Sequence, residues 1–301
     1  MRHIRRLIIL ACMFVLLWMS ASVVEWSTGH RVLPWNAYGN CGYSKPTDLP
    51  KTIQVGLYEE FPNPWRLKQL RYVTFPVTLA VAAPSRAEFL TLRSTILREY
   101  PHVREVYFWP VLSHDEGYYP GSWSDSAAVQ RVANEATDLP VLWDMEMPLQ
   151  QLPSSARSWR DNKEFLNHWL LARTQPVHIW RTHTTMGLDP LFLRLAGMHF
   201  DPLDYPQVSL HLDLYMKDTD PTDEQMAHIL RCGVERYGSR FIPSFGVLDD
   251  GYGSGFVSPV ILQRNLTLAR EAGVSQIWLF GVNGLNESVV TMLKESIPLE
   301  E

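Results

Sequence analysis

The sequence predicts an α/β fold, a single closed (β/α)₈ (TIM) barrel, and two observations support this prediction. Short apolar runs alternate with amphipathic helical segments along most of the chain, and no second pattern interrupts them. Successive units are spaced by roughly 25–35 residues, the length of one strand–helix unit. Eight units over about 245 residues match the size of one such barrel.

The apolar runs have the length of strands and are rich in Val and aromatic residues. A doubly wound open sheet is the competing fold. It normally has a glycine-rich turn after its first strand, and "GLYEEFPNPW" at 56–65 is not such a turn. We therefore expect barrel strands over residues 52–58, 77–83, 105–112, 139–146, 176–182, 207–216, 240–248 and 276–282.

Helical segments lie between these runs, and several have recognisable ends. Residues 86–99 carry apolar side chains at helical spacing. Two further helices show start and stop signals of the kind that capping predicts. These are Ser258 and Pro259 before a stop at Gly273, and the capping-box pair Thr222 and Gln225 before a stop at Gly238.

The N-terminus is a separate segment. Three arginines among the first six residues precede an uncharged apolar run at 7–24, which is just long enough to span a bilayer. Because the arginines stay on the cytoplasmic side, we expect the rest of the chain to be extracytoplasmic, either secreted or membrane-anchored. The predicted organisation is a signal peptide or membrane anchor at 1–25, a linker or lid at 26–50, and the barrel at 51–298.

The charge of the chain argues against nucleic acid as a partner. The net charge is −5, so no basic field attracts a phosphate backbone. The hydrophobic fraction of 46% is ample for a large core. Cys41 and Cys232 lie in the part expected to be exported, where they form either one disulfide or two buried thiols.

Polar side chains on several predicted strands face the barrel interior. On the strand at 207–216 the even positions are apolar and suit packing against helices, so the odd positions point inward. The same alternation applies to the strands at 52–58, 139–146 and 176–182. Because the site of such a barrel lies at the C-terminal strand ends, these groups should converge there. The inward candidates are Tyr58, Glu60, Asp144, Glu146, His178, Trp180, His211, Asp213 and Tyr215.

The stretch "DMEMP" (144–148) resembles the end of the fourth-strand signature of family 18 glycoside hydrolases, D-x-x-D-x-D-x-E followed by an aromatic residue and proline. Asp144, Glu146 and Pro148 match its last Asp, its Glu and its Pro. Leu139 and Leu142 stand where its first two aspartates would be. The resemblance implies a chitinase-like barrel that hydrolyses glycans.

Two further features are similar to this family. The family has a tyrosine on the sixth strand that supports the reacting acetamido group, and Tyr215 is the matching candidate. It also has an aromatic residue near the end of the eighth strand. The resemblance implies that Trp278 or Phe280 forms the floor of the sugar site.

Cleavage of a glycosidic bond needs a proton donor and a negative group that stabilises an oxocarbenium-like charge. We expect Glu146 to be the general acid/base and Asp144 its electrostatic partner, with no cofactor and no metal ion. For a substrate without an acetamido group, Asp213 or Asp249 would act as the second carboxylate. The expected substrate-binding residues are Tyr58, Glu60, Trp109, His178, Trp180, His211, Asp249 and Trp278.

Two predicted loops at the C-terminal strand ends, at 113–125 and 248–256, are rich in aromatic residues. Exposed aromatic faces can stack on pyranose rings, which favours an oligo- or polysaccharide substrate. The alternative is that the rings merely plug the opening. The residues concerned are Tyr118, Tyr119, Trp123, Tyr252 and Phe256.

Two other functions stay open. His178, His183, His211 and Asp213 are the residue types that hold a divalent ion in metal-dependent barrel hydrolases, although the first strand has no His-x-His motif. A barrel that binds glycans without cleaving them would account for the two missing aspartates. Loss of turnover in the presence of a chelator would identify the metal-dependent hydrolase. Glycan binding without turnover would identify the non-catalytic barrel.

Overall fold

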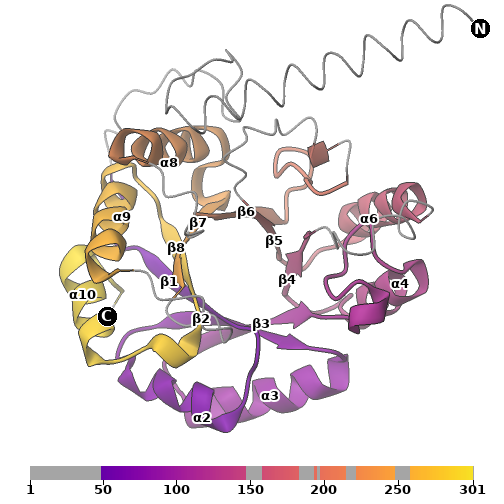
Figure 1. Ribbon diagram of the computed structural model, residues 1–301, viewed down its shortest axis with the longest axis horizontal. Coiled ribbons are helices and arrows are strands. Elements are labelled where there is room, and N and C mark those ends of the chain that lie inside the picture. The colour runs from indigo at the N-terminus through magenta and orange to yellow at the C-terminus, as the bar shows by residue number, and fades with distance from the viewer. Residues whose placement is uncertain are drawn as a thin grey trace, which may run out of the picture.

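The computed structural model describes residues 49–146, 158–182, 193–194, 197–214, 222–247 and 258–300. Within these ranges, eight parallel strands form a closed barrel in sequence order, and β8 pairs with β1 (Figure 1). The predicted (β/α)₈ barrel is confirmed. Because the sheet closes on itself, the doubly wound open sheet is excluded.

Each of the eight predicted strands is present, with ends that differ by a few residues from those expected. Their apolar alternation is what allowed the sequence to locate them. The strands are β1 Gln54–Glu59, β2 Val77–Ala83, β3 Val103–Pro110, β4 Val141–Asp144, β5 Val177–Thr182, β6 Val208–Asp213, β7 Phe241–Val247 and β8 Gln276–Phe280.

Helices surround the barrel on its outer side (Figure 1). The α-helices are α2 Pro64–Leu67, α3 Arg86–Glu99, α4 Ser126–Glu135, α6 Trp159–Ala172, α8 Asp223–Tyr237, α9 Pro259–Glu271 and α10 Glu287–Ser296. Short 3₁₀ turns are η1 Lys68–Tyr72, η2 His114–Glu116, η5 Gly238–Arg240 and η6 Val282–Gly284.

The predicted capping box of α8 is confirmed by both of its hydrogen bonds. The backbone N–H of Gln225 donates to Thr222 Oγ1 at 3.3 Å, and the Thr222 N–H donates to Gln225 Oε1 at 2.9 Å. Helix α9 begins as expected, with Ser258 at the N-cap and Pro259 at the first position. The start signals in the sequence therefore mark these helix ends correctly.

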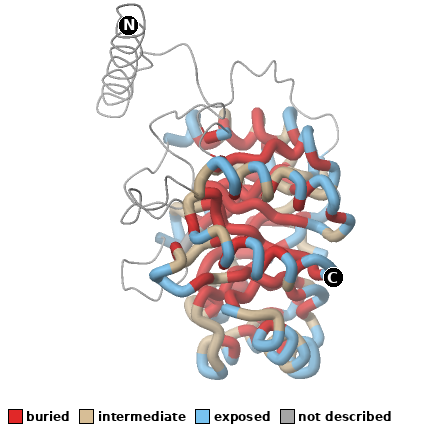
Figure 2. The backbone as a smooth tube through the Cα atoms, turned by 90° about the vertical axis from the view of Figure 1, so that its right-hand side faces the viewer, coloured by how far each residue is buried: buried red, intermediate tan, exposed pale blue. Residues whose placement is uncertain are grey.

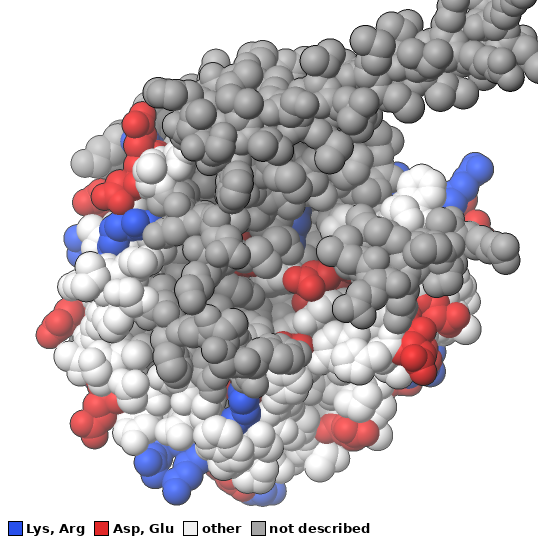
Figure 3. Space-filling view, viewed as in Figure 1, with Lys and Arg blue, Asp and Glu red and all other residues white. Residues whose placement is uncertain are grey.

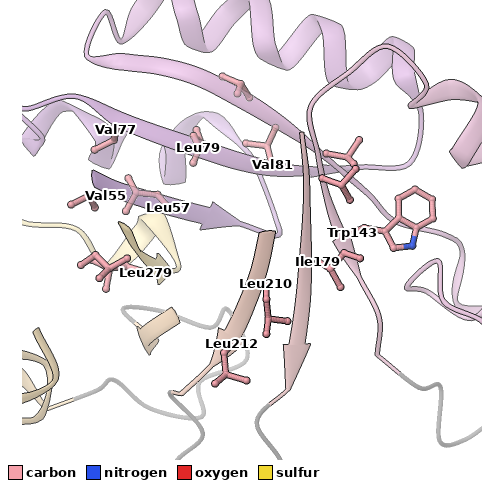
Figure 4. Close-up of a cluster of buried hydrophobic side chains, with 14 of the residues drawn as sticks. Val55, Leu57, Val77, Leu79, Val81, Trp143, Ile179, Leu210, Leu212 and Leu279 are labelled. Carbon is pink, nitrogen blue, oxygen red and sulfur yellow. The ribbon is translucent and has the colours of Figure 1, made fainter. Parts of the chain in front are cut away.

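Alternation along each strand separates two cores. The outer core lies between strands and helices and contains the even-numbered apolar residues of β6, as predicted. Figure 4 labels two of them, Leu210 and Leu212, and Figure 2 shows in red the buried positions through the interior of the molecule. The inner core fills the barrel, and its members come from seven of the strands. The inner core comprises Tyr58, Ala80, Ala82, Tyr107, Trp109, Leu142, Trp180, Ile242, Trp278 and Phe280.

The predicted export segment at 7–24 and nearly all of the predicted linker lie outside the described residues. Among the residues that are described, no helix combines the length and apolarity needed to cross a membrane. Cys232 on α8 is disulfide-bonded, which is the first of the two expected alternatives for this cysteine. The other two cysteines, Cys12 and Cys41, lie outside the described residues.

Candidate functional site

Four carboxylates lie at or just beyond the C-terminal ends of β1, β4 and β6, and we call them the mouth cluster: Glu60, Asp144, Glu146 and Asp213. Glu60 follows β1 directly, Asp144 ends β4 and Asp213 ends β6. Three of the four are buried, and Glu146 is half-buried. Acidic atoms are visible near the centre of the face shown in Figure 3. The predicted alternation holds along β4 and β6, because Leu142 lies in the inner core and Leu212 in the outer core.

Asp144 is the most strongly perturbed carboxyl of the mouth cluster. Burial raises its pKa well above the ordinary value, and the negative charges of Glu146, Glu60 and Asp213 raise it further. The backbone N–H of Glu146 donates to Asp144 Oδ1 at 3.2 Å and opposes this shift. Asp144 therefore keeps its proton far into the pH range in which an exposed aspartate has lost it.

Glu60 is held by two tyrosines from the loop between β3 and α4. The hydroxyl of Tyr118 donates to Glu60 Oε1 at 2.9 Å, and that of Tyr119 donates to the same oxygen at 3.1 Å. Burial raises the pKa of Glu60, whereas both hydrogen bonds lower it. Its neighbour Glu59 faces the other side of β1 and pairs with Arg66 at 3.3 Å.

Deeper in the barrel lie four aromatic rings that we call the lower cluster: Tyr107, His178, His211 and Trp278. The His178 ring stacks on Tyr107 at 4.4 Å between centroids and lies 4.5 Å from the His211 ring. Trp278 meets both imidazoles edge-on and is fully buried. Burial lowers the pKa of His178 to about 3 and that of His211 well below its ordinary value. Both imidazoles are therefore neutral.

Tyr58 connects the lower cluster to the mouth cluster. Its hydroxyl is hydrogen-bonded to His211 Nδ1 and to Ser244 Oγ, the latter at 2.6 Å. Burial raises its pKa well above the ordinary value, and the charges of Asp213 and Asp144 raise it further. Tyr58 is consequently a neutral phenol within the electrostatic reach of both aspartates.

Aromatic side chains line the barrel interior around the mouth cluster. Trp109 is buried and stacks on Tyr119, with ring planes 8° apart and centroids 6.4 Å apart. Trp180 and Phe280 are also nearly buried. Phe280 lies closer to the strand ends than Trp278, because Tyr58 pairs with Phe280 and Gly56 with Trp278. Trp278 is thus enclosed below this wall.

The aromatic residues of the loop at 113–125 are less exposed than predicted. Tyr118, Tyr119 and Trp123 are all half-buried. The two tyrosines bond Glu60, and Trp123 packs on Trp159 of α6 with centroids 5.9 Å apart. The loop therefore contributes a packed wall to the mouth rather than a row of free rings.

The barrel brings together ten of the twelve predicted site residues as inward or mouth side chains: Tyr58, Glu60, Trp109, Asp144, Glu146, His178, Trp180, His211, Asp213 and Trp278. Two others, Tyr215 and Asp249, lie outside the described residues. His183 and Pro148, and the loop aromatics Tyr252 and Phe256, also lie outside them.

No group of three or more His, Cys, Asp or Glu side chains within the described ranges is arranged to hold a metal ion. His178 and His211 lie side by side, and Asp213 ends the strand that carries His211. His183, the fourth residue of the metal hypothesis, belongs to the part of the chain that is not described.

Sequence reasoning missed two residues of the site and one contact made by residues that it had named. Tyr107 stacks on His178 across the barrel, Ser244 bonds the Tyr58 hydroxyl, and the hydroxyls of Tyr118 and Tyr119 bond Glu60. Strand parity was the available signal for Tyr107, which shares a face with Trp109. No comparable local signal pointed to the tyrosine–Glu60 bonds.

Comparison with known proteins supports the fold. No family model matches the sequence, and no curated protein matches it. The glycoside hydrolase domain of PgaB (BpsB) from Bordetella bronchiseptica is similar, with a TM-score of 0.52 and 12% identity, over 83% of this chain and 100% of that one. This chain therefore shares a TIM-barrel fold with that domain.

A D-allulose 3-epimerase from Methylomonas sp. is also similar, with a TM-score of 0.48 and 13% identity, over 83% of this chain and 100% of that chain. This likeness is too distant to support an argument. Fold and site together define the class: a TIM-barrel protein with a buried acidic cluster at the C-terminal ends of its strands.

Proposed function

We propose that this barrel is a glycoside hydrolase that cleaves an oligo- or polysaccharide at its mouth. One observation carries the proposal. Asp144, a buried carboxyl with a strongly raised pKa, ends β4, and the half-buried Glu146 follows two residues later. A carboxyl that retains its proton beside a second, more accessible carboxylate is the arrangement that acid/base cleavage of a glycosidic bond uses.

In this proposal the two carboxyls share one proton. In the free protein the proton resides on Asp144, because burial and three neighbouring carboxylates oppose its ionisation. A bound sugar excludes water from Glu146 and raises its pKa, so the proton moves to Glu146 and leaves Asp144 negative. Glu146 then protonates the leaving oxygen, while Asp144 stabilises the positive charge that develops on the sugar ring.

Other features agree with this chemistry. The positions of Asp144 and Glu146 resemble the strand-four signature of family 18, and the barrel fold is shared with a domain that is itself a glycoside hydrolase. In the substrate-assisted variant the acetamido oxygen of the sugar attacks, and Tyr215 is the residue proposed to support it. The aromatic wall of Trp109, Tyr119, Trp180 and Phe280 suits the apolar faces of pyranose rings.

The decisive experiment replaces Glu146 with Gln, which preserves shape but removes the transferable proton. Release of reducing ends is measured on a panel of soluble oligosaccharides, both N-acetylated and neutral. We expect turnover to fall by about 10²–10⁴-fold while binding of the cleaved oligosaccharide survives. The matched control is Glu271→Gln, which changes an exposed glutamate on α9.

Turnover by the wild type that Glu146→Gln leaves intact would refute the assignment. Binding of an oligosaccharide without any turnover would identify a lectin-like barrel, and turnover abolished by a chelator would identify a metal-dependent hydrolase.

We also propose that the barrel works outside the cytoplasm, as a secreted or membrane-anchored protein. The support is the apolar run at 7–24 behind its N-terminal arginines. Cell fractionation tests this: the full-length chain in the cytosolic fraction would refute it.

A further inference from the structure

Glu60 is a buried carboxylate that the acid/base pair leaves without a role. The residue is 7% exposed just beyond the end of β1, and two hydroxyl groups converge on its Oε1. Two donors at 2.9 and 3.1 Å occupy both lone pairs of this oxygen, and hydrogen bonds of this kind favour the ionised form of the carboxyl. Among the described residues, no further hydrogen bond reaches Oε2, so this oxygen is left to accept one from a ligand.

The loop that supplies the two tyrosines has a demanding backbone. Gly117 has φ 114°, and Tyr118 has φ 59°, the one positive value among the non-glycine residues described. A tyrosine in the left-handed region is unfavourable by about 1–2 kcal/mol and persists only where its surroundings determine it. Here the strained residue, Tyr118, is one of the two whose hydroxyls reach Glu60.

Several contacts hold this loop in place. The side chain of Glu116 accepts from the Ser113 N–H at 3.1 Å and pairs with Arg131 at 3.2 Å. Ser124 Oγ donates to the Tyr119 carbonyl at 2.5 Å. The loop is therefore built to present Tyr118 and Tyr119 in one fixed arrangement.

A second observation at the same wall points to a ligand. The Nε1–H of Trp109 is buried, and within the described part of the chain it has no hydrogen-bond acceptor. Its ring stacks on Tyr119, one of the two residues that hold Glu60. A buried donor without an acceptor is costly, and a bound oxygen atom would satisfy it.

We propose that Glu60 is a second substrate-contacting carboxylate, and that Tyr118 and Tyr119 are its positioning residues. This inference rests on the proposed function. Oε2 of Glu60 accepts a hydrogen bond from a sugar hydroxyl, and the Trp109 indole donates to a sugar oxygen. Glu60 stays ionised through the reaction and adds negative charge beside the sugar ring, while Asp144 and Glu146 handle the proton.

The test uses Tyr118→Phe and Tyr119→Phe in the full chain, with Tyr205→Phe as the matched control. Tyr205 donates its hydroxyl to Asn167 at 2.6 Å, away from the mouth. The pH dependence of kcat/KM is measured on the oligosaccharide of the panel that the wild type cleaves fastest. Loss of one tyrosine hydroxyl removes a hydrogen bond to Glu60 and raises its pKa. The acidic limb of the pH profile of kcat/KM should therefore move to higher pH by about one unit in Tyr118→Phe and in Tyr119→Phe. The control should not move it.

Glu60→Gln is the second variant, because a glutamine oxygen can still accept from both tyrosines and the loop keeps its support. We expect kcat to fall by about 10²-fold with a folded protein, as judged by its thermal melting. An acidic limb unmoved in both tyrosine variants, or kcat unchanged in Glu60→Gln, would overturn the inference while leaving the proposed function intact. The proposed function fails separately, through an active Glu146→Gln variant.

Discussion

The mouth cluster and the lower cluster occupy the same barrel interior, yet they solve the problem of buried polar groups in opposite ways. The lower cluster neutralises its imidazoles by burial and stacks them among aromatic rings. In the mouth cluster, burial and the three other carboxylates raise the pKa of Asp144, and burial raises the pKa of Glu60. The lower cluster thus resembles a packed core, whereas the mouth holds unfavourable charge of the kind that active sites retain.

The two clusters should therefore respond differently to mutation. A change in the mouth should alter activity far more than stability, and a change in the lower cluster should do the reverse. Stability and function trade against each other at sites where charge is held against repulsion. The predictions below begin with the largest expected effect.

Asp144→Asn should give the largest loss of activity in this comparison. The amide cannot share a proton with Glu146 or develop a negative charge, so turnover should fall by about 10²–10⁴-fold. The variant should be at least as stable as the wild type above neutral pH, because a buried carboxyl with a raised pKa is replaced by a neutral group. Steady-state kinetics check the expected loss of turnover, and chemical denaturation checks the expected stability. A fully active variant would show that Asp144 serves only the structure.

Gly56→Ala should break the lower cluster. A Cβ at Gly56 would lie 2.0 Å from a ring atom of Trp278, whose indole is fully buried and cannot move away freely. We expect a loss of about 3 kcal/mol in the free energy of unfolding, measured by denaturant titration. Gly238→Ala is the control: its backbone is strained, with φ 58°, but its Cβ would meet nothing within 4 Å, so about 1 kcal/mol is expected. Equal losses in both would show that the barrel interior adapts to the extra atom.

Much of this arrangement could be predicted from the sequence, because strand alternation has a fixed period. Once the apolar face of β6 was assigned to the helices, His211 and Asp213 had to face inward. The same rule placed Glu60 at the mouth and Glu59 on the opposite face of the strand, where it pairs with Arg66. The capping box of α8 was equally local, since two residues three positions apart decide it.

What the sequence did not predict depends on closure of the barrel and on loop backbone. The stack of Tyr107 on His178 joins β3 to β5, strands that do not pair, so no register argument reveals it. The bonds from Tyr118 and Tyr119 to Glu60 require a positive φ at a tyrosine, which no propensity suggests. Such a conformation comes from the contacts around a loop and not from its residue types.

The smallest expected effect is the change in the free energy of unfolding on acidification. This change should have opposite signs for the lower cluster and for Asp144 of the mouth cluster. The pKa of His178 is about 3 in the folded protein, below its value in the unfolded chain, so the unfolded state binds more protons between these values. Stability from the lower cluster should therefore fall as the pH drops below about 6.5, by about 1 kcal/mol per imidazole between pH 7 and 5.5. Asp144 acts in the opposite direction: its folded pKa is raised, so the folded state binds more protons and gains stability as the pH falls toward the ordinary aspartate value.

The contributions of His178 and Asp144 can be separated by denaturant titration of the wild type, His178→Asn and Asp144→Asn at pH 7 and 5.5. His178→Asn should lose less stability on acidification than the wild type, and Asp144→Asn should lose more. If both variants follow the wild-type slope, the two clusters do not differ in protonation, and the contrast between a neutral lower cluster and a proton-holding mouth is wrong.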